Sequence, residues 1–202
     1  MNIFATDIDP KVSAIALDTS RVNKMIIESA SLLANAISHY GGISQDLPIS
    51  KGTGQPFKTK AWQNHPACLW VKESRTNYEW LYDHMVALID ELKFRKSTVH
   101  SMTANLQILK NGANFVPPGP LTPFANCTPY KQIDDPIRAY QMTMVYKWEH
   151  DGKIPLWDKR GQPTWYTKDL VDLTKSTDGE FPWTGLRLSR TKRTSGWLTN
   201  AI

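Results

Sequence analysis

Capping side chains placed directly before proline constrain the fold of this chain more than any other feature of its sequence. Asp9-Pro10, Asn64-His65-Pro66 and Asp135-Pro136 each join a hydrogen-bond acceptor to the residue that is preferred at the first position of a helix. Proline loses nothing there, because the first amides of a helix have no partner within it. The pattern therefore predicts a helix start at each of these points.

Apolar residues recur at helical spacing along two long segments. The first begins near Asp18 or Ser20 and ends at Gly41-Gly42, a typical C-terminal signal. The second follows Asn64 and is predicted to run to about Leu92 as one helix. Their apolar stripes predict the core of the fold: Val22, Met25, Ile26, Leu33 and Ile37 in the first segment, and Trp70, Ser74, Asn77, Leu81, Met85, Leu88 and Leu92 in the second.

Other helical patterns are shorter, and loops separate them. Ser97 is predicted to cap a helix that continues to about Leu109, and a turn or two of helix is predicted within residues 166–174. Residues 41–61 and 115–130 are rich in Gly, Pro and polar residues, which is typical of loops. A loop as long as the first is usually functional or mobile. No segment reads convincingly as a strand.

These patterns predict an all-α protein, a compact single-domain helical bundle with long loops and a basic C-terminal tail. We expect residues 1–166 to form the helical domain and residues 167–202 to form a C-terminal extension. The last sixteen residues contain cations and no acid, so they could contact phosphates or form a solvated terminus. The cations of this tail are Arg187, Arg190, Lys192 and Arg193.

Composition excludes several classes of protein. With 41% hydrophobic and 21% charged residues over 202 positions, the chain has a globular composition. Cys68 and Cys127 cannot build a disulfide framework or a four-cysteine zinc site, and we expect neither a metal nor a cofactor. No apolar run approaches the length of a membrane span, so we expect a cytoplasmic protein without a membrane partner. The net charge of +5 favours a polyanion, DNA or a nucleotide, as partner.

Arg21, Lys24 and Glu28 form the first candidate site. Offsets of three and four residues place all three side chains on one face of the predicted helix. A carboxylate beside cations can act as a general base or stabilise a cationic, oxocarbenium-like sugar, while the cations hold phosphates. The same spacing also fits an intrahelical ion pair on a solvated face.

The second long segment supplies the remaining candidates. His65 stands at a helix N-terminus, which lowers the pKa of an imidazole and leaves it neutral to exchange a proton or bond a base edge. Asn77 and His84 lie on or beside the stripe of Trp70, where polar groups need partners or a ligand. We expect His65 and Asn77 to contact a base, Trp70 and His84 to bind the substrate or nucleic acid with them, and Arg75 to hold phosphate. A capping turn at His65 and polar groups satisfied between packed helices are the alternatives.

Several blocks of the sequence together resemble one family, the pyrimidine dimer DNA glycosylases of phages and bacteria, also called endonuclease V-like. The Asp-x-x-Arg-x-x-Lys-x-x-x-Glu block that begins at Asp18 and the Asn-His-Pro-Ala block followed by Trp70 are the most specific of them. The resemblance covers roughly residues 1–166 in short blocks. They are MNIFATDIDPKVSA, DTSRVNKMIIESASLL, WQNHPACLWVKESRTNYEWLYDH, LTPFANCTPY and QPTWY.

The resemblance implies a mostly helical enzyme that cleaves the N-glycosidic bond of a damaged pyrimidine and then nicks the DNA backbone. In the characterised phage enzyme a free α-amine attacks the sugar C1′ and forms a Schiff base. A glutamate on the first long helix supports that step, and nearby arginines grip phosphates. Glu28 best fits the glutamate, with Arg21 and Lys24 as the phosphate ligands.

The beginning of the chain departs from that pattern. The characterised enzyme exposes a small threonine after methionine removal, whereas residue 2 here is Asn. We therefore expect Met1 to be retained and the apolar Ile3 and Phe4 to pack inward. The predicted activity is that of an N-glycosidase with Glu28 as acid/base or charge stabiliser. The alternatives are a non-enzymatic phage factor that binds a nucleotide or a protein in counter-defence, and a glycosidase of free nucleotides.

Overall fold

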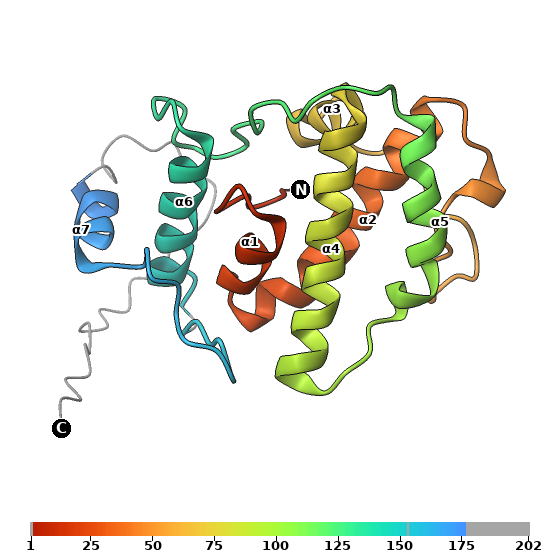
Figure 1. The fold of residues 1–202 in the computed structure, drawn as a ribbon. Coiled ribbons are helices and arrows are strands. Elements are labelled where there is room, and N and C mark those ends of the chain that lie inside the picture. Colours follow the sequence, from red (N-terminus) through yellow and green to blue (C-terminus); the bar gives the residue numbers. More distant parts are fainter. Residues whose placement is uncertain (1, 153, 177–202) are drawn as a thin grey trace.

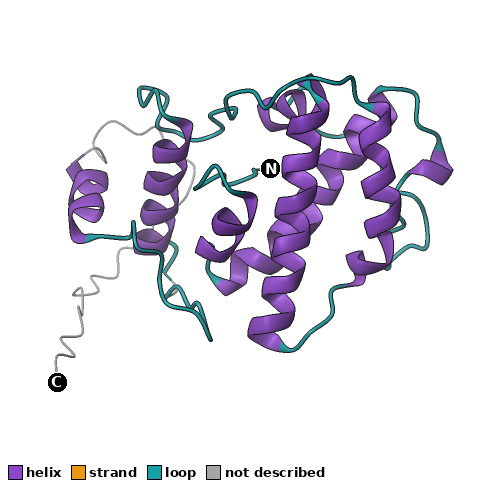
Figure 2. Cartoon of the chain, viewed as in Figure 1, coloured by secondary structure: helices purple, strands orange, loops and turns teal. Residues whose placement is uncertain are grey.

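The computed structural model of the protein describes residues 2–152 and 154–176. Over this part of the chain the fold is all-α, as predicted, and no strand forms (Figure 2). No helix in these residues is both long and apolar enough to cross a membrane. The α-helices are α1 (Pro10–Ala16), α2 (Thr19–His39), α3 (Pro66–Glu73), α4 (Arg75–Lys96), α5 (Leu106–Asn111), α6 (Pro136–His150) and α7 (Lys168–Ser176). The short 3₁₀ turns are η1 (Ser44–Asp46), η2 (Ser101–Asn105) and η3 (Gly112–Phe115).

The three helix starts predicted before proline are confirmed at the level of individual hydrogen bonds. Asp9 accepts the amides of Lys11 and Val12 at the start of α1. His65 and Asp135 each accept an amide in the same way at the starts of α3 and α6. Local sequence therefore determines where these helices begin, because each cap bonds an amide two or three residues further along the chain.

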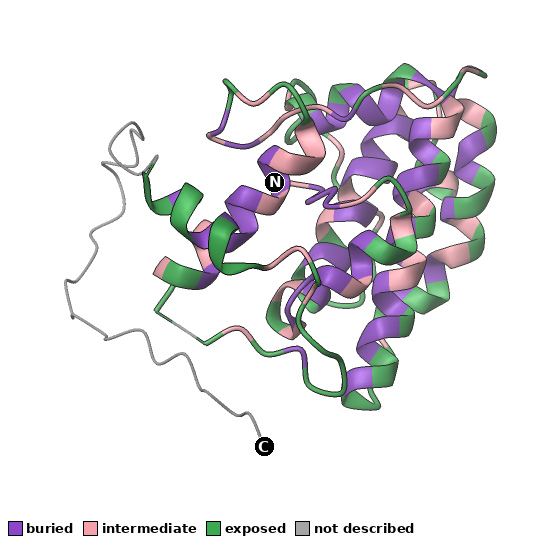
Figure 3. Ribbon diagram, turned by 60° about the vertical axis from the view of Figure 1, so that its left-hand side comes forward, coloured by how far each residue is buried: buried purple, intermediate pink, exposed green. Residues whose placement is uncertain are grey.

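The core lies where α2 packs along α4, with α1 and α3 beside them (Figure 1). Every residue of the two predicted apolar stripes is buried. Figure 3 shows the pattern on the ribbon, with buried positions on the facing sides of the helices and exposed positions outside. Burial of these stripes holds the long helices against each other, at roughly 25 cal/mol for each Å² of apolar surface.

The prediction of a single helix from residue 64 to residue 92 is wrong, because the helix breaks at Ser74. The backbone of Ser74 is extended, with φ −153° and ψ 155°. Its hydroxyl accepts the amide of Asn77 at 3.1 Å and donates to the carbonyl of Pro120 at 2.7 Å. Ser74 thereby ends α3 and caps α4, and the loop of Pro120 supplies a bond that no local pattern contains.

The predicted role of Ser97 is also wrong. Ser97 ends α4 in the left-handed conformation, with φ 54°, and does not begin the next helix. The N-cap that follows is His100, whose Nδ1 accepts the amide of Met102 at 3.0 Å. A serine between two helical patterns can serve either one, and here α4 continues to Lys96 before the chain turns.

Helix α6 attaches to the rest of the fold through the N-terminal segment and the start of α2. The indole of Trp148 donates to Asp18 at 2.9 Å, and Gln141 donates to the carbonyl of Thr6 at 3.1 Å. Helix α7, at the position of the predicted turns, packs on α6 (Figure 1). The division at residue 166 stays a prediction, and the basic tail lies outside the described residues.

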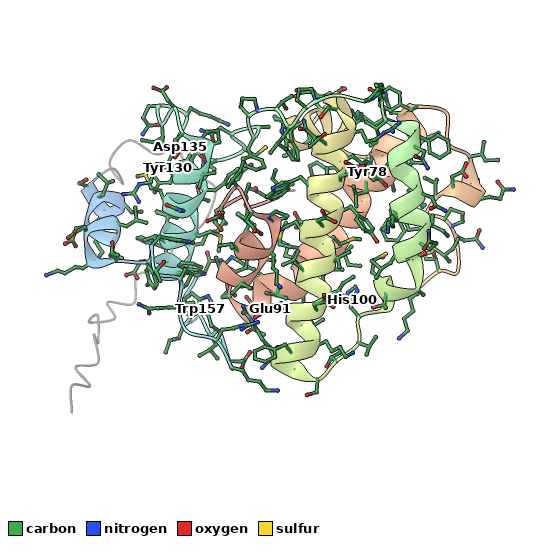
Figure 4. All side chains as sticks on the ribbon, viewed as in Figure 1. Tyr78, Glu91, His100, Tyr130, Asp135 and Trp157 are labelled. Carbon is green, nitrogen blue, oxygen red and sulfur yellow. The ribbon has the colours of Figure 1, made fainter. Side chains whose placement is uncertain are left out.

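A buried carboxylate joins α4 to α1 and to the segment after α6. Glu91 pairs with the buried Arg95 at 2.8 Å and with Arg160 at 2.8 Å. Figure 4 shows Glu91 on the side of α4 that faces the segment of Trp157. Burial disfavours the charged carboxylate, but the hydrogen bonds from Arg160 and Arg95 outweigh burial and lower the pKa of Glu91. Arg95 also donates to the carbonyls of Leu17 and Ile15, near the end of α1.

Glu91→Ala leaves Arg95 buried without its counter-ion, and we predict that the free energy of unfolding falls by about 3–5 kcal/mol. Urea denaturation measures this loss. The matched control is Glu79→Ala, an exposed glutamate on the same helix, which should change the stability by less than about 0.5 kcal/mol. Equal effects of the two substitutions would contradict a structural role for the Glu91 pair.

Candidate functional site

Glu28 lies midway along α2 and holds the beginning of the chain. Its Oε2 accepts the backbone N–H of Asn2 at 2.9 Å, and its Oε1 lies 3.3 Å from Nζ of Lys24. The Glu28 side chain is 18% exposed, whereas that of Lys24 is 71% exposed. Glu28 is therefore a largely enclosed carboxylate with one cation on its solvent side, where an anionic ligand could approach.

The N-terminal segment turns sharply at this carboxylate. Oδ1 of Asn2 accepts the amides of Ile3 and Phe4 at 2.8 and 3.0 Å, and Phe4 has a left-handed φ of 44°. Ile3 and Phe4 are buried, so their inward packing is confirmed. With Ile3 and Phe4 packed in this way, the backbone nitrogen of Asn2 still lies at hydrogen-bond distance from the Glu28 carboxylate.

A cavity of about 350 Å³ lies between the start of α2 and the end of α6. Lys24 belongs to both features, since it pairs with Glu28 and lines the cavity. The cavity therefore gives an anionic group a place at Lys24, the partner of the carboxylate. Its charged and hydroxyl side chains are Asp18, Ser20, Arg21, Lys24, Lys147 and Asp151.

Arg21 is fixed in the wall of this cavity by two carboxylates. Its guanidinium bonds Asp18 at 2.6 Å and also pairs with Asp151, and its side chain is 14% exposed. Burial alone would raise the pKa of Asp18, but hydrogen bonds from Ser20, Arg21 and Trp148 lower it. The charge of Arg21 is thus compensated within the protein, which the spacing on α2 alone did not indicate.

Lys147 is a cavity residue that sequence reasoning missed. Burial lowers the pKa of its ammonium, Asp151 opposes that shift, and the nearby Arg21 and Lys24 add to it. Lys147 stands one residue before Trp148 on α6, at the edge of the apolar face of that helix. A lysine at the edge of an apolar stripe was the only signal in the sequence, and long solvated lysines give the same signal.

His65 shares the surroundings of Glu28. Its Nδ1 accepts the amide of Ala67 at 3.2 Å, so the hydrogen of the neutral ring is on Nε2. Burial lowers the pKa of His65, the charge of Lys131 adds to this shift, and Glu28 opposes it. The expected direction is confirmed, and burial is its largest cause. The ring therefore offers a neutral N–H donor near the carboxylate.

The structure does not bring Trp70 and Asn77 into this site. Asn77 is fully buried, and its amide donates to the carbonyl of Trp70 and to the hydroxyl of Thr122, both at 2.7 Å. Its Oδ1 accepts the amide of Thr122 at 2.9 Å. Trp70 is 1% exposed and packs against Trp80 and Phe124. Both placements favour the alternative in which these side chains satisfy the packing of α3 and α4.

His84 and Arg75 are likewise held by the protein itself. His84 is fully buried, stacks on Trp80 and bonds the carbonyl of Pro10 through Nδ1 at 2.9 Å. Burial lowers its pKa to about 4, so the ring is neutral, and its Nε2 has no partner. Arg75 is half-buried and donates to the carbonyl of Val116 at 3.3 Å. Of the predicted residues, the structure therefore gathers Arg21, Lys24 and Glu28, and the charge of Glu28 also acts on His65.

One comparison with known proteins gives a result. A family model described as pyrimidine dimer DNA glycosylase matches residues 1–105, which include α1 to α4 with both Glu28 and His65. No curated protein and no solved structure matches the chain.

Asn77→Leu removes three hydrogen bonds inside the fold, and we predict that the free energy of unfolding falls by about 2–4 kcal/mol. Affinity for duplex DNA, measured well below the melting temperature, should stay within about twofold. Asn23→Leu, at an exposed position of α2, is the control for stability. A stable Asn77→Leu variant with weakened DNA binding would instead support contact with a base.

Proposed function

The chain belongs to the pyrimidine dimer DNA glycosylase family, and from this premise we propose that it cleaves the N-glycosidic bond of a damaged pyrimidine in DNA. The observation that carries the proposal is the position of Glu28. Its carboxylate is largely enclosed, contacts the nitrogen of residue 2, and pairs with Lys24, which lines a cavity with further basic side chains.

Glu28 has the chemistry that this bond cleavage needs. Loss of the base leaves positive charge on the sugar, as in an oxocarbenium ion, and a carboxylate beside C1′ stabilises that charge. The same carboxylate can take a proton from the attacking nucleophile. His65, with its hydrogen on Nε2, can donate a hydrogen bond to the departing base.

The cavity that Lys24 lines suits a phosphate of the target nucleotide. Lys24 extends into solvent and can pair with a phosphate, and Lys147 lies in the cavity wall. Arg21 is paired with Asp18 and Asp151, which compensate its charge. We therefore assign it the role of shaping the cavity more than of binding DNA. The excess of positive charge over the whole chain adds to the attraction.

The nucleophile depends on what precedes Asn2. When Met1 is attached, the nitrogen of Asn2 is an amide, whose lone pair is delocalised and does not attack a sugar. A chain that begins at Asn2 presents a primary amine at the same place, 2.9 Å from Glu28. The protein that retains Met1 would use water as the nucleophile and only release the base. The protein that begins at Asn2 could form a Schiff base with the sugar and then nick the strand.

We predict that Glu28→Gln folds normally but releases base at least about 100-fold more slowly, the scale of a positioned acid/base group. The measurement is single-turnover base release from a duplex that contains one thymine dimer. Glu79→Gln, an exposed glutamate on α4, should match the wild-type rate. A wild-type rate for Glu28→Gln would show that Glu28 only forms an ion pair with Lys24. If the wild-type protein binds the duplex but releases no base, a protein that sequesters its ligand is favoured instead.

Borohydride trapping on abasic-site DNA distinguishes the two nucleophiles. We predict no trapped adduct and no strand nicking above background for protein that retains Met1. Protein released from a cleavable fusion so that it begins at Asn2 should form an adduct on the Asn2 amine. An adduct in the first preparation that maps to the amine of Met1 would show that the longer terminus also reaches the sugar.

A further inference from the structure

The long loop between α2 and α3 folds back on itself as a small hairpin. Ile49 and Pro56 face each other in an isolated antiparallel bridge, and the amide of Ser50 donates to the carbonyl of Gln55 at 2.9 Å. We call residues 48–60 the lysine hairpin. Figure 1 shows it in orange, on the side of the fold where α5 lies.

Three contacts fasten the lysine hairpin to the fold. The buried Asn105 accepts the amide of Ile49 through Oδ1 at 2.7 Å and donates to the carbonyl of Ile49 through Nδ2 at 3.1 Å. Phe57 packs against the core, and the hydroxyl of Thr59 donates to that of Ser38 on α2 at 3.0 Å. The loop is therefore held in one place, which favours a functional loop over a mobile one.

The lysine hairpin carries positive charge that the protein does not compensate. Lys51, Lys58 and Lys60 are exposed, and no Asp or Glu occurs in residues 47–72. Among the residues that the structure describes, none of the three lysines forms an ion pair. Their charge is thus available to a polyanion.

The tip of the hairpin leaves its backbone uncovered. The φ of Gly52 lies outside the left-handed region, and a methyl group on its Cα would meet only the hydroxyl of Ser50, at 4.0 Å. The fold therefore does not require a glycine at this position. A glycine there does allow a ligand to approach the backbone closely.

Helix α2 connects the lysine hairpin to Glu28. Ser38, which accepts the bond from Thr59, stands ten residues after Glu28, or about 15 Å along the helix axis. The two positions lie roughly a fifth of a turn apart around the helix, so they share one side of it. A straight duplex that lies over this side with its target at Glu28 passes the hairpin about four to five base pairs away.

We propose that the lysine hairpin binds the phosphate backbone of duplex DNA about four to five base pairs to one side of the target nucleotide. The proposal rests on the proposed function, which places the target at Glu28. Bonds from lysine to phosphate carry no sequence information, but they fix the position and the orientation of a protein on the duplex. The hairpin thereby aligns the duplex with α2, at a distance from the reacting sugar.

The salt dependence of binding tests this contact without catalysis, on an undamaged duplex of about 20 base pairs. Lys51→Gln, Lys58→Gln and Lys60→Gln combined should weaken affinity in about 0.1 M salt by at least about tenfold and lower the slope of log affinity against log salt by about 2 to 3. The three lysines changed to arginine should keep the wild-type slope. An unchanged slope in the glutamine variant would overturn the proposal.

A second triple variant controls for the loss of net charge. Lys93→Gln, Lys168→Gln and Lys175→Gln remove three exposed cations of α4 and α7. The slope of this control should fall by less than about 1. A loss as large as that of the hairpin variant would show that any three surface cations attract DNA equally, and would overturn a specific contact at the hairpin.

Shortened duplexes test the position of the contact. Each contains one thymine dimer and ends about two base pairs beyond it on one side, short of the expected contact. The proteins carry Glu28→Gln, so that the substrate is not consumed during binding. Shortening on the hairpin side should weaken the protein with intact lysines by at least about tenfold and the triple glutamine variant by less than about threefold. Equal losses in the two proteins on both shortened duplexes would overturn the placement.

The two proposals fail in different ways. If the wild-type protein releases no base from the full-length duplex, the proposed function fails, and the salt slope still decides whether the hairpin binds DNA. If it releases base and the glutamine variant keeps the wild-type slope, only the hairpin contact fails.

Discussion

The buried carboxylate of Asp18 is the interaction on which the rest of the site depends. It caps α2, bonds Arg21 on the same helix and accepts the indole N–H of Trp148 on α6. One side chain thus sets where α2 begins and where α6 docks against it. The cavity lies between these two helices, and Glu28 follows on α2 at a position that the start of the helix determines. Burial by itself would raise the pKa of this carboxyl group, and the bonds from Ser20, Arg21 and Trp148 lower it.

Polar residues within the apolar stripes of α3 and α4 are bonded by other parts of the protein. Asn77 looks like a group that awaits a ligand when only its helix is considered, but Thr122 in a distant loop and the carbonyl of Trp70 supply its partners. The break at Ser74 has the same origin, since a loop bond to Pro120 lets one hydroxyl end α3 and cap α4. Buried polar groups are satisfied by whatever packs on them, and that neighbour comes from elsewhere in the chain.

The residues of the candidate site lie instead where helices meet less regular segments. The turn at Asn2 brings a backbone nitrogen to Glu28, and the turn at Trp62 presents an indole beside His65. Phe4 and Trp62 both adopt the left-handed conformation without being glycine. Packing of Ile3 and Phe4 in the core holds the first turn, whereas hydrogen bonds from His65 and Lys72 hold the second. The rigid α2–α4 pair serves as the platform for both.

The sequence by itself determined the helix starts at Asp9, Asp18, His65 and Asp135, the two buried stripes, and the common helix of Lys24 and Glu28. These features depend on residues a few positions apart, and the helix brings such residues together wherever it lies. Only the tertiary structure decided that Arg21 pairs with Asp151, 130 residues away, and that Asn2 meets Glu28 across 26 residues. It also brought Lys147 to the cavity and enclosed Asn77. Contacts of that kind depend on how the helices pack, which no local spacing encodes.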